Sequence, residues 1–317
     1  MALPGRNITL DYTKLVLSIL VITTHTNISE HGLFGWLISD GFARVAVPLF
    51  LIVNGYYFAN IVNDKAKVKK YIIRLFIIYA TWMVIYSPFL WYMTGGGKKL
   101  LLINIFTGYY HLWYIASLIG ASIVIYLTRK FKLSILLTIA LILFFISYAI
   151  QKIYLFDIHI FMYPTIVRTF LMMGFPFMFA GYYINKMRLE DKAFFKNTGM
   201  LVITAILFIP LLAESAFVYF SKVGEIDPVK DELYLVMPIL CPLIFLSVLK
   251  YAKYKPDDDG YISKLASSVY FIHIMAIFII TGFPYKADIT MFPLYFFLSI
   301  LLSTALLEVN KRIKIFL

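Results

Sequence analysis

Cysteine and charged residues are scarce in this chain. Only one of its 317 residues is cysteine, Cys241, and 15% are charged, whereas a soluble domain carries about a quarter charged residues. A single cysteine excludes an intrachain disulfide, and nothing near it in the sequence suggests a metal, so we expect no metal site. A composition this poor in charge excludes a water-soluble globule.

Long apolar runs take the place of the missing charge. Hydrophobic residues make up 62% of the chain, and the mean hydropathy is +0.84. A helix needs about 20 apolar residues to cross a bilayer. Ten runs qualify, at residues 10–30, 41–60, 71–94, 111–129, 132–150, 163–185, 197–220, 233–251, 266–283 and 289–310. We therefore predict an all-α integral membrane protein of about ten transmembrane helices, with residues 1–317 forming one polytopic domain.

The basic residues are distributed unevenly between the connections. If the N-terminus is cytoplasmic, the inside segments carry 20 of the 29 Lys and Arg residues and the outside segments carry 6. This asymmetry satisfies the positive-inside rule and predicts that both termini are cytoplasmic, in a multi-pass protein of the cytoplasmic membrane. The net charge of +12 therefore reflects topology rather than nucleic-acid binding. The longest connections, 95–110 and 221–232, leave no room for a soluble domain.

A histidine lies in the first apolar run. His25 follows the uncharged stretch from Leu15 to Thr24, beyond the pair Asp11 and Lys14. An ionisable group inside a membrane span is costly to bury and is by default a functional hypothesis. Histidine also transfers protons readily near neutral pH. The other interpretation is a core histidine that bonds a carbonyl or hydroxyl.

The predicted topology separates the polar residues of the spans by depth. At about 1.5 Å per residue, one basic group falls at the inner face, and a mixed group falls in the outer half. The inner group contains Asp11, Lys14, Lys70 and Arg74; the outer group contains His25, Arg44, Arg168 and Glu214, with His111 at its mouth and His273 near mid-span. Ion pairs that only fix helix packing are the alternative interpretation of the outer charges.

Spans two and six share a weak pattern. The second span holds an arginine, a proline and then Gly55-Tyr56-Tyr57, and the sixth repeats this order before Gly181-Tyr182-Tyr183. Glycine permits close helix packing and tyrosine favours the membrane interface, which is the simplest explanation of the pattern. Pro48, in the second span, predicts a kink.

Several segments together resemble the acyltransferase-3 family of polytopic membrane acyltransferases. The first carries Asp11, Lys14 and His25, at the family's spacing of an acid, a base three residues on and a histidine about eleven further. The others are Arg44-Val45-Ala46-Val47-Pro48-Leu49-Phe50 through Gly55, His111-Leu112-Trp113-Tyr114-Ile115, and Ser268-Val269-Tyr270-Phe271-Ile272-His273. Each motif is degenerate, but their order and spacing cover nearly the whole chain.

The resemblance implies transfer of an acyl group, usually acetyl, from cytoplasmic acyl-CoA to an extracytoplasmic carbohydrate or other surface molecule. By position His25 is then the catalytic histidine, and Asp11 and Arg44, which match positions implicated in activity, are further catalytic candidates. Lys14, which also matches such a position, is assigned with Lys70 and Arg74 to donor binding. Basic residues at the inner mouth would hold the CoA phosphates. His111, Arg168, Glu214 and His273 are candidates for the acceptor site.

One position departs from the family pattern. Many members carry Arg-x-x-Arg at the start of the third span; Arg74 matches the second arginine, but Tyr71 replaces the first. Lys70 is adjacent and supplies a point charge, although lysine lacks the bidentate fork of arginine. Lys14 and the run from Arg74 to Tyr79 resemble the branch that contains the membrane domains of vancomycin-resistance serine racemases.

Two functions remain open at this stage. The first is an integral membrane O-acyltransferase in which His25 is the general base on the acceptor hydroxyl or carries the acyl group briefly, and Arg44 stabilises the oxyanion. The second is a transporter of a small polar solute such as serine, with broken helices around Pro48 and Pro176 and with His25 and Glu214 as proton carriers. The chain has no evident inverted repeat, which counts against the transporter, and ten spans exceed what a simple membrane anchor needs.

Overall fold

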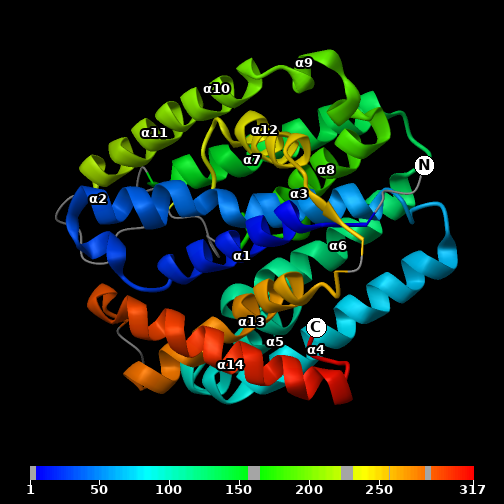
Figure 1. Cartoon of the computed structure of the whole chain (residues 1–317). Helices are drawn as coiled ribbons and strands as arrows, with labels where there is room; N and C mark the ends of the chain where they lie inside the picture. The colour runs from blue at the N-terminus through cyan, green and yellow to red at the C-terminus, as the bar shows by residue number, and fades with distance from the viewer. Residues whose placement is uncertain (1–4, 156–164, 223–230, 257, 283–286) are drawn as a thin grey trace. The chain divides into compact units, whose positions relative to one another are not determined.

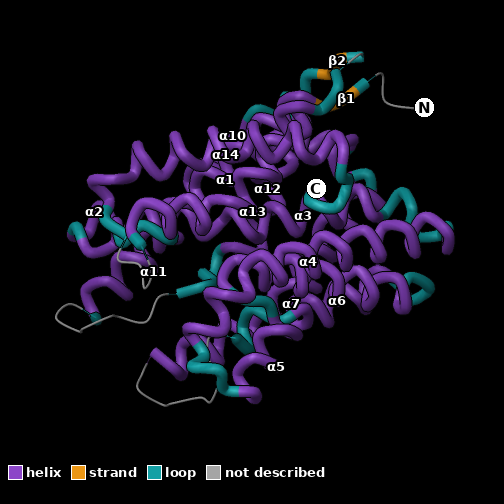
Figure 2. The backbone as a smooth tube through the Cα atoms, turned by 90° about the horizontal axis from the view of Figure 1, so that it is seen from below, coloured by secondary structure: helices purple, strands orange, loops and turns teal. Residues whose placement is uncertain are grey.

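The computed structural model describes residues 5–155, 165–222, 231–256, 258–282 and 287–317. Within these ranges the chain is helical almost throughout, as Figure 2 shows, and the two strands described are two residues long. Seven helices of the described residues are long and apolar enough to cross a bilayer: Gly32–Phe58, Lys65–Met93, Tyr110–Thr128, Leu133–Leu155, Gly199–Ser221, Tyr261–Thr281 and Ile289–Arg312. The predicted all-α membrane class is therefore confirmed.

The chain forms two compact units, and each draws on separate parts of the sequence. Unit 1 contains Met1–Phe50, Glu190–Lys230 and Leu243–Leu317, and unit 2 contains Leu51–Leu189 and Asp231–Pro242. Two of the four boundaries between the units fall inside α3 (Ala46–Phe58) and α12 (Met237–Lys250).

In unit 1, helices α1 and α13 lie side by side, and α14 packs against α13 (Figure 1). The strands β1 and β2 pair antiparallel. In the sequence, β1 comes just before α1, and β2 lies between α12 and α13. The elements of this unit are β1 (Arg6–Asn7), α1 (Ile8–Thr23), α2 (Gly32–Trp36), α9 (Ala193–Lys196), α10 (Gly199–Ile206), α11 (Phe208–Ser221), β2 (Tyr254–Lys255), α13 (Tyr261–Thr281) and α14 (Phe292–Arg312).

In unit 2, α6 and α7 both pack against α8 and the π-helical turn before it, and α4 packs against α6. Its elements are α4 (Lys65–Met93), α5 (Lys98–Thr107), α6 (Trp113–Thr128), α7 (Leu133–Leu155), the π-helical turn Phe170–Gly174 and α8 (Phe175–Met187). The side chain of Asp64 caps α4 by accepting from the backbone N–H groups of Ala66 and Lys67, at 3.0 and 3.1 Å.

The helix ends differ from the predicted spans in three places. α1 ends at Thr23, so His25 lies in the turn after the helix rather than within it. Arg168 lies in a turn before α8, whereas the prediction placed it inside a span. The predicted connection 95–110 contains α5, because residues 100–106 are apolar enough to continue as a helix after three glycines.

A helix overlaps each of the ten predicted ranges, but α1, α8 and α12 are short. The count of ten spans and the cytoplasmic termini stay predictions. Pro48 lies in the first turn of α3, where its missing N–H disturbs no helical bond. A π-helical turn (Leu37–Gly41) and a 3₁₀ turn (Phe42–Val45) precede α3, so the helix is irregular in the turns just before the proline. The kink at Pro48 stays a prediction.

Candidate active site

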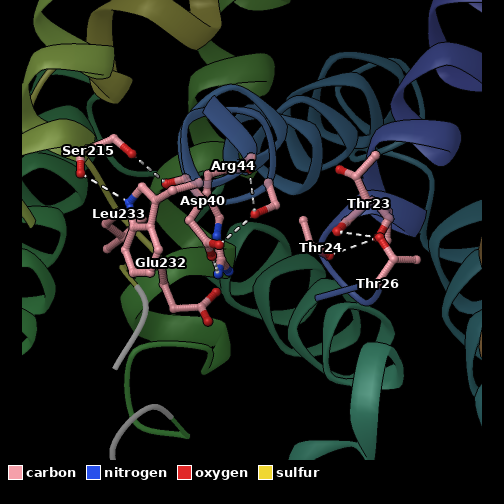
Figure 3. Close-up of polar contacts among 12 residues, drawn as sticks. Thr23, Thr24, Thr26, Asp40, Arg44, Ser215, Glu232 and Leu233 are labelled. Atoms are coloured by element: carbon pink, nitrogen blue, oxygen red, sulfur yellow. Dashed lines mark hydrogen bonds and ion pairs between the residues drawn. The ribbon is translucent and has the colours of Figure 1, made fainter. Parts of the chain in front are cut away.

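Threonine hydroxyls hold the turn that carries His25. At the end of α1, Thr23 Oγ1 donates to the carbonyl of Leu20 at 2.7 Å, and Thr24 Oγ1 donates to that of Val21 at 2.8 Å. Thr26 Oγ1 reaches back to the carbonyl of Thr23 at 3.0 Å (Figure 3). The last carbonyls of a helix need such partners, so this sequence both ends α1 and fixes the turn. The His25 ring is half-buried there.

A second histidine faces His25 within unit 1. His273 lies in the middle of α13 and is fully buried. Its ring centroid is 5.3 Å from that of His25, with an angle of 44° between the ring planes. His273 Nδ1 lies 2.7 Å from the carbonyl oxygen of Tyr270. Two imidazoles from opposite ends of the sequence therefore meet in one place.

The register of α1 against α13 is fixed by polar contacts. Lys14 Nζ donates to Ser263 Oγ at 3.3 Å, and Ser18 Oγ donates to the carbonyl of Ala266 at 2.8 Å. The later residue of α1 contacts the later residue of α13, so the two helices run in the same direction. The same pairing brings His25 beside His273 further along.

A cluster of charges surrounds the start of α1. Asp11 is buried and pairs with Arg6, and its other oxygen lies 3.5 Å from Lys14 Nζ. Arg6 also approaches Asp258 at 3.8 Å, and Lys255 approaches Asp258 at 3.9 Å. Three cations thus meet two acids, and the excess charge of this cluster is positive. About nine residues of helix, or ~14 Å, separate Lys14 from the end of α1.

Arg44 has a partner that the sequence analysis did not name. Asp40 is fully buried, pairs with the Arg44 guanidinium and accepts from Ser39 Oγ at 2.6 Å (Figure 3). The Asp40 carbonyl accepts from Ser215 Oγ at 3.2 Å, and Ser215's own carbonyl accepts from Trp36 Nε1 at 3.1 Å. The spacing of Asp40 and Arg44, four residues apart on a helical segment, was a usable sign of this pair.

Arg168 also pairs with an acid missed at the sequence level. In unit 2 its guanidinium binds Glu232 and lies over the Trp113 ring, 5.6 Å from the centroid. Gln151 is fully buried and accepts from the backbone N–H groups of Glu232 and Leu233 at 2.7 and 2.9 Å. Nothing in the sequence links these residues, because Glu232 falls in a predicted connection about 80 positions from Gln151.

Position 71 has a packing role in unit 2. Tyr71 donates its hydroxyl to Asn54 Oδ1 at 3.2 Å, and Asn54 Nδ2 donates to the Tyr114 hydroxyl at 2.8 Å. Lys70 and Arg74 are exposed on the first turns of α4. The tyrosine that departs from the family pattern therefore bonds inward, while the neighbouring cations face outward.

The remaining predicted site residues are dispersed. His111 is buried in the turn before α6, where the Tyr86 ring meets it edge-on at 5.3 Å. Glu214 is half-buried on α11 in unit 1. Unit 1 thus holds Asp11, Lys14, His25, Arg44, Glu214 and His273, and unit 2 holds Lys70, Arg74, His111 and Arg168.

A family model described as an acyltransferase domain, acyltransferase-3, matches residues 7–308. The chain belongs to the acyltransferase-3 family. With its long apolar helices, it is a multi-pass membrane protein with an acyltransferase domain.

Two curated relatives are amino-acid racemases of Enterococcus faecalis. One is 26% identical over 305 residues, which cover 86% of this chain and 42% of the relative. The other is 33% identical over 150 residues, covering 44% of this chain and 21% of the relative. The chain thus spans less than half the length of either relative, and it fits the racemase-linked branch that the motifs indicate. No solved structure matches.

Proposed function

We propose that this acyltransferase moves an acyl group, acetyl in the simplest case, from acyl-CoA to a hydroxyl of an extracytoplasmic carbohydrate or similar surface molecule. The donor enters from the cytoplasm, and the enzyme works in the cytoplasmic membrane of a bacterial cell envelope. Membership of the acyltransferase family supports group transfer and gives no support to the alternative, a serine transporter.

The observation that carries the proposal is the composition of α1 and its flanks. One end holds a positively charged cluster built on Arg6, Asp11 and Lys14, and the other end holds a half-buried imidazole. A CoA thioester has the matching form, because its phosphates are anionic and its reactive carbonyl lies at the far end of an extended pantetheine arm. Helix α1 is long enough to separate a site for the phosphates at one end from a site for the thioester carbonyl at the other.

Donor binding falls to the cations. Lys14, Lys70 and Arg74 hold the CoA phosphates through charge-assisted hydrogen bonds. Asp11 is one helix length from His25, so its role is to orient Arg6 and Lys14 rather than to take part in the chemistry. Lys70 and Arg74 are exposed on α4, so both are accessible to an anionic donor.

The chemistry is assigned to His25. Its imidazole accepts the proton of the acceptor hydroxyl as the oxygen attacks the thioester carbonyl carbon. The C–O bond forms, the C–S bond breaks, and the imidazolium returns its proton to the departing thiolate, so that the products are the ester and CoA thiol. Arg44, oriented by Asp40, stabilises the negative charge on the carbonyl oxygen in the tetrahedral intermediate.

The outer polar residues are assigned to the acceptor. His111, Arg168 and Glu214 offer donors and acceptors suited to hydroxyl groups. Arg168 lies over Trp113, a combination that suits a sugar ring with its apolar face and polar edge. The acceptor is therefore expected to be a polyhydroxylated molecule.

The test uses protein reconstituted in oriented vesicles, with labelled acetyl-CoA supplied on the cytoplasmic face only. We expect label on a carbohydrate acceptor confined to the opposite side, with one CoA thiol released per ester formed. Accumulation of labelled serine without acetyl-CoA, lost when the pH gradient is removed, would support the transporter and contradict the enzyme. His31→Ala, which alters an exposed histidine, is the control variant.

A further inference from the structure

The contact between His25 and His273 has a geometry that stacking does not explain. The 44° angle between the planes is neither parallel nor edge-on. A ring nitrogen lies ~1 Å from its ring centroid, and an N–H···N bond spans ~3 Å. Two imidazoles joined nitrogen to nitrogen therefore have centroids ~5 Å apart, so at 5.3 Å the rings of His25 and His273 are close enough for such a bond. His273 Nε2 is buried and makes no hydrogen bond to His25 in the structure, so the bond requires the His25 ring to turn toward it.

The backbone of α13 selects the tautomer of His273. Its Nδ1 lies 2.7 Å from the carbonyl oxygen of Tyr270 and 3.3 Å from that of Val269. A carbonyl oxygen only accepts, so Nδ1 carries a hydrogen and donates it. The neutral ring then has its lone pair on Nε2, the other nitrogen. A hydrogen bond between the backbone and one ring nitrogen commonly determines whether the other nitrogen carries a proton.

The environment keeps His273 in this position. The side chain is 0% exposed, so its ring has no room to rotate into solvent. Ser18 and Lys14 hold α1 in register with α13 through Ala266 and Ser263. His25, in contrast, is half-buried in a turn and has more freedom to reorient. The ring of His273 is thus fixed, whereas the ring of His25 needs a hydrogen-bond partner to fix its orientation.

We propose that His273 is a positioning residue for His25, which rests on the proposed role of His25 as general base. When the His25 ring turns toward it, His273 Nε2 accepts the N–H of one His25 nitrogen, so the second His25 nitrogen keeps its lone pair and is directed at the acceptor hydroxyl. The chain runs from the Tyr270 carbonyl through His273 to His25. It orients the base without placing a negative charge beside it, and it removes His273 from the acceptor-site candidates.

The variant His273→Leu removes the acceptor nitrogen at similar volume, and His273→Gln keeps a hydrogen-bonding group near the position of Nε2. We expect His273→Leu to lower kcat about 10- to 100-fold, as loss of an orienting partner does elsewhere, with KM for acyl-CoA unchanged. His273→Gln should recover part of the loss. Equal losses in both variants together with a lowered melting temperature would overturn the proposal in favour of packing.

A spectroscopic readout separates this proposal from the role of His25 in catalysis. The chain contains five histidines, so ¹⁵N-histidine labelling gives five imidazoles, and His25→Ala identifies the signals of His25. We expect one tautomer of His25 in the parent and in His31→Leu, and a mixture of two in His273→Leu. A single unchanged tautomer in His273→Leu overturns the positioning role. Full activity in His25→Ala would instead remove the proposed function, while the tautomer result still decides whether His273 holds His25.

Discussion

Two pairs of parallel helices in this molecule are built in opposite ways. Between α1 and α13 the contacts are polar, through a lysine, serines and two imidazoles. Between α3 and α8 in unit 2 the backbones themselves meet: a Cβ on Gly55 would lie 1.8 Å from the Met178 carbonyl oxygen, and one on Gly181 would lie 1.9 Å from that of Ile52. The first interface places reactive groups, and the second brings the two backbones into close contact.

The comparison shows where function and stability are separable. Hydrogen-bonding side chains between membrane helices are costly to bury and are retained where they serve a purpose. Glycine at a crossing serves packing, because it lets helices approach closely enough for van der Waals contact along the backbone. Changes at α3 and α8 should therefore act on folding, and changes at α1 and α13 on activity.

The largest stability effect is expected from Gly55→Ala. The added Cβ has no space against the Met178 carbonyl, so the two helices must separate. Such overpacking costs about 1–3 kcal/mol of unfolding free energy, measured as a lowered melting temperature in detergent. Gly199→Ala is the control, because a Cβ there meets its nearest neighbour at 3.6 Å. Equal melting temperatures for the two variants would contradict the close crossing.

A smaller loss is expected from Glu232→Gln. The variant removes the charge that pairs with Arg168 but keeps the side-chain size. Breaking a fully buried pair costs about 3–5 kcal/mol; the Arg168 side chain is 32% exposed, so we expect about 1–2 kcal/mol after discounting for solvent screening. Glu308→Gln, which breaks the exposed pair with Lys311, is the control and should leave melting unchanged. A Glu232→Gln protein as stable as the parent would show that this pair contributes nothing.

Arg74→Gln should affect donor binding and leave stability unchanged. We expect KM for acyl-CoA to rise about 10-fold with kcat nearly constant, because phosphate contacts bind ground state and transition state alike. Raised salt should likewise increase the KM of the parent enzyme for acyl-CoA, because salt screens the phosphate contacts. Lys69→Gln is the matched control, since it lies about 140° around α4 from Arg74. A collapsed kcat with unchanged KM would contradict the assigned role.

The smallest effect concerns position 71. Tyr71→Phe removes the hydroxyl that donates to Asn54 and keeps the ring. We expect a loss of about 0.5–1.5 kcal/mol in stability, the net contribution of one hydrogen bond, with KM for acyl-CoA unchanged. A raised KM would mean that Tyr71 itself contacts the donor, contrary to the inward direction of its hydroxyl.

The sequence was informative where the determinants are local. Apolar runs located a helix in each predicted range, and the motifs around His25 and His273 indicated the family. The glycines of spans two and six also suggested close packing, which Gly55 and Gly181 confirm.

Long-range pairings were not accessible from the sequence. Nothing local shows that His25 meets His273, or that Glu232 is held by Gln151 and Arg168, because each contact depends on how distant helices pack. The end of α1 before His25 was missed for another reason: threonines continue an apolar run in hydropathy, yet their hydroxyls bond the last carbonyls and close the helix. Asp40 could have been found from its spacing to Arg44.

The most direct test of the account compares His25→Ala with His31→Ala in a transfer assay with acetyl-CoA. His25 is half-buried beside His273, whereas His31, six residues on, is exposed. We expect transfer by His25→Ala to fall by about 10²–10⁴-fold, the usual contribution of a general base, with the melting temperature of the parent, while His31→Ala remains fully active. Transfer by His25→Ala at the rate of the parent would contradict the assignment of the chemistry to the α1–α13 pair.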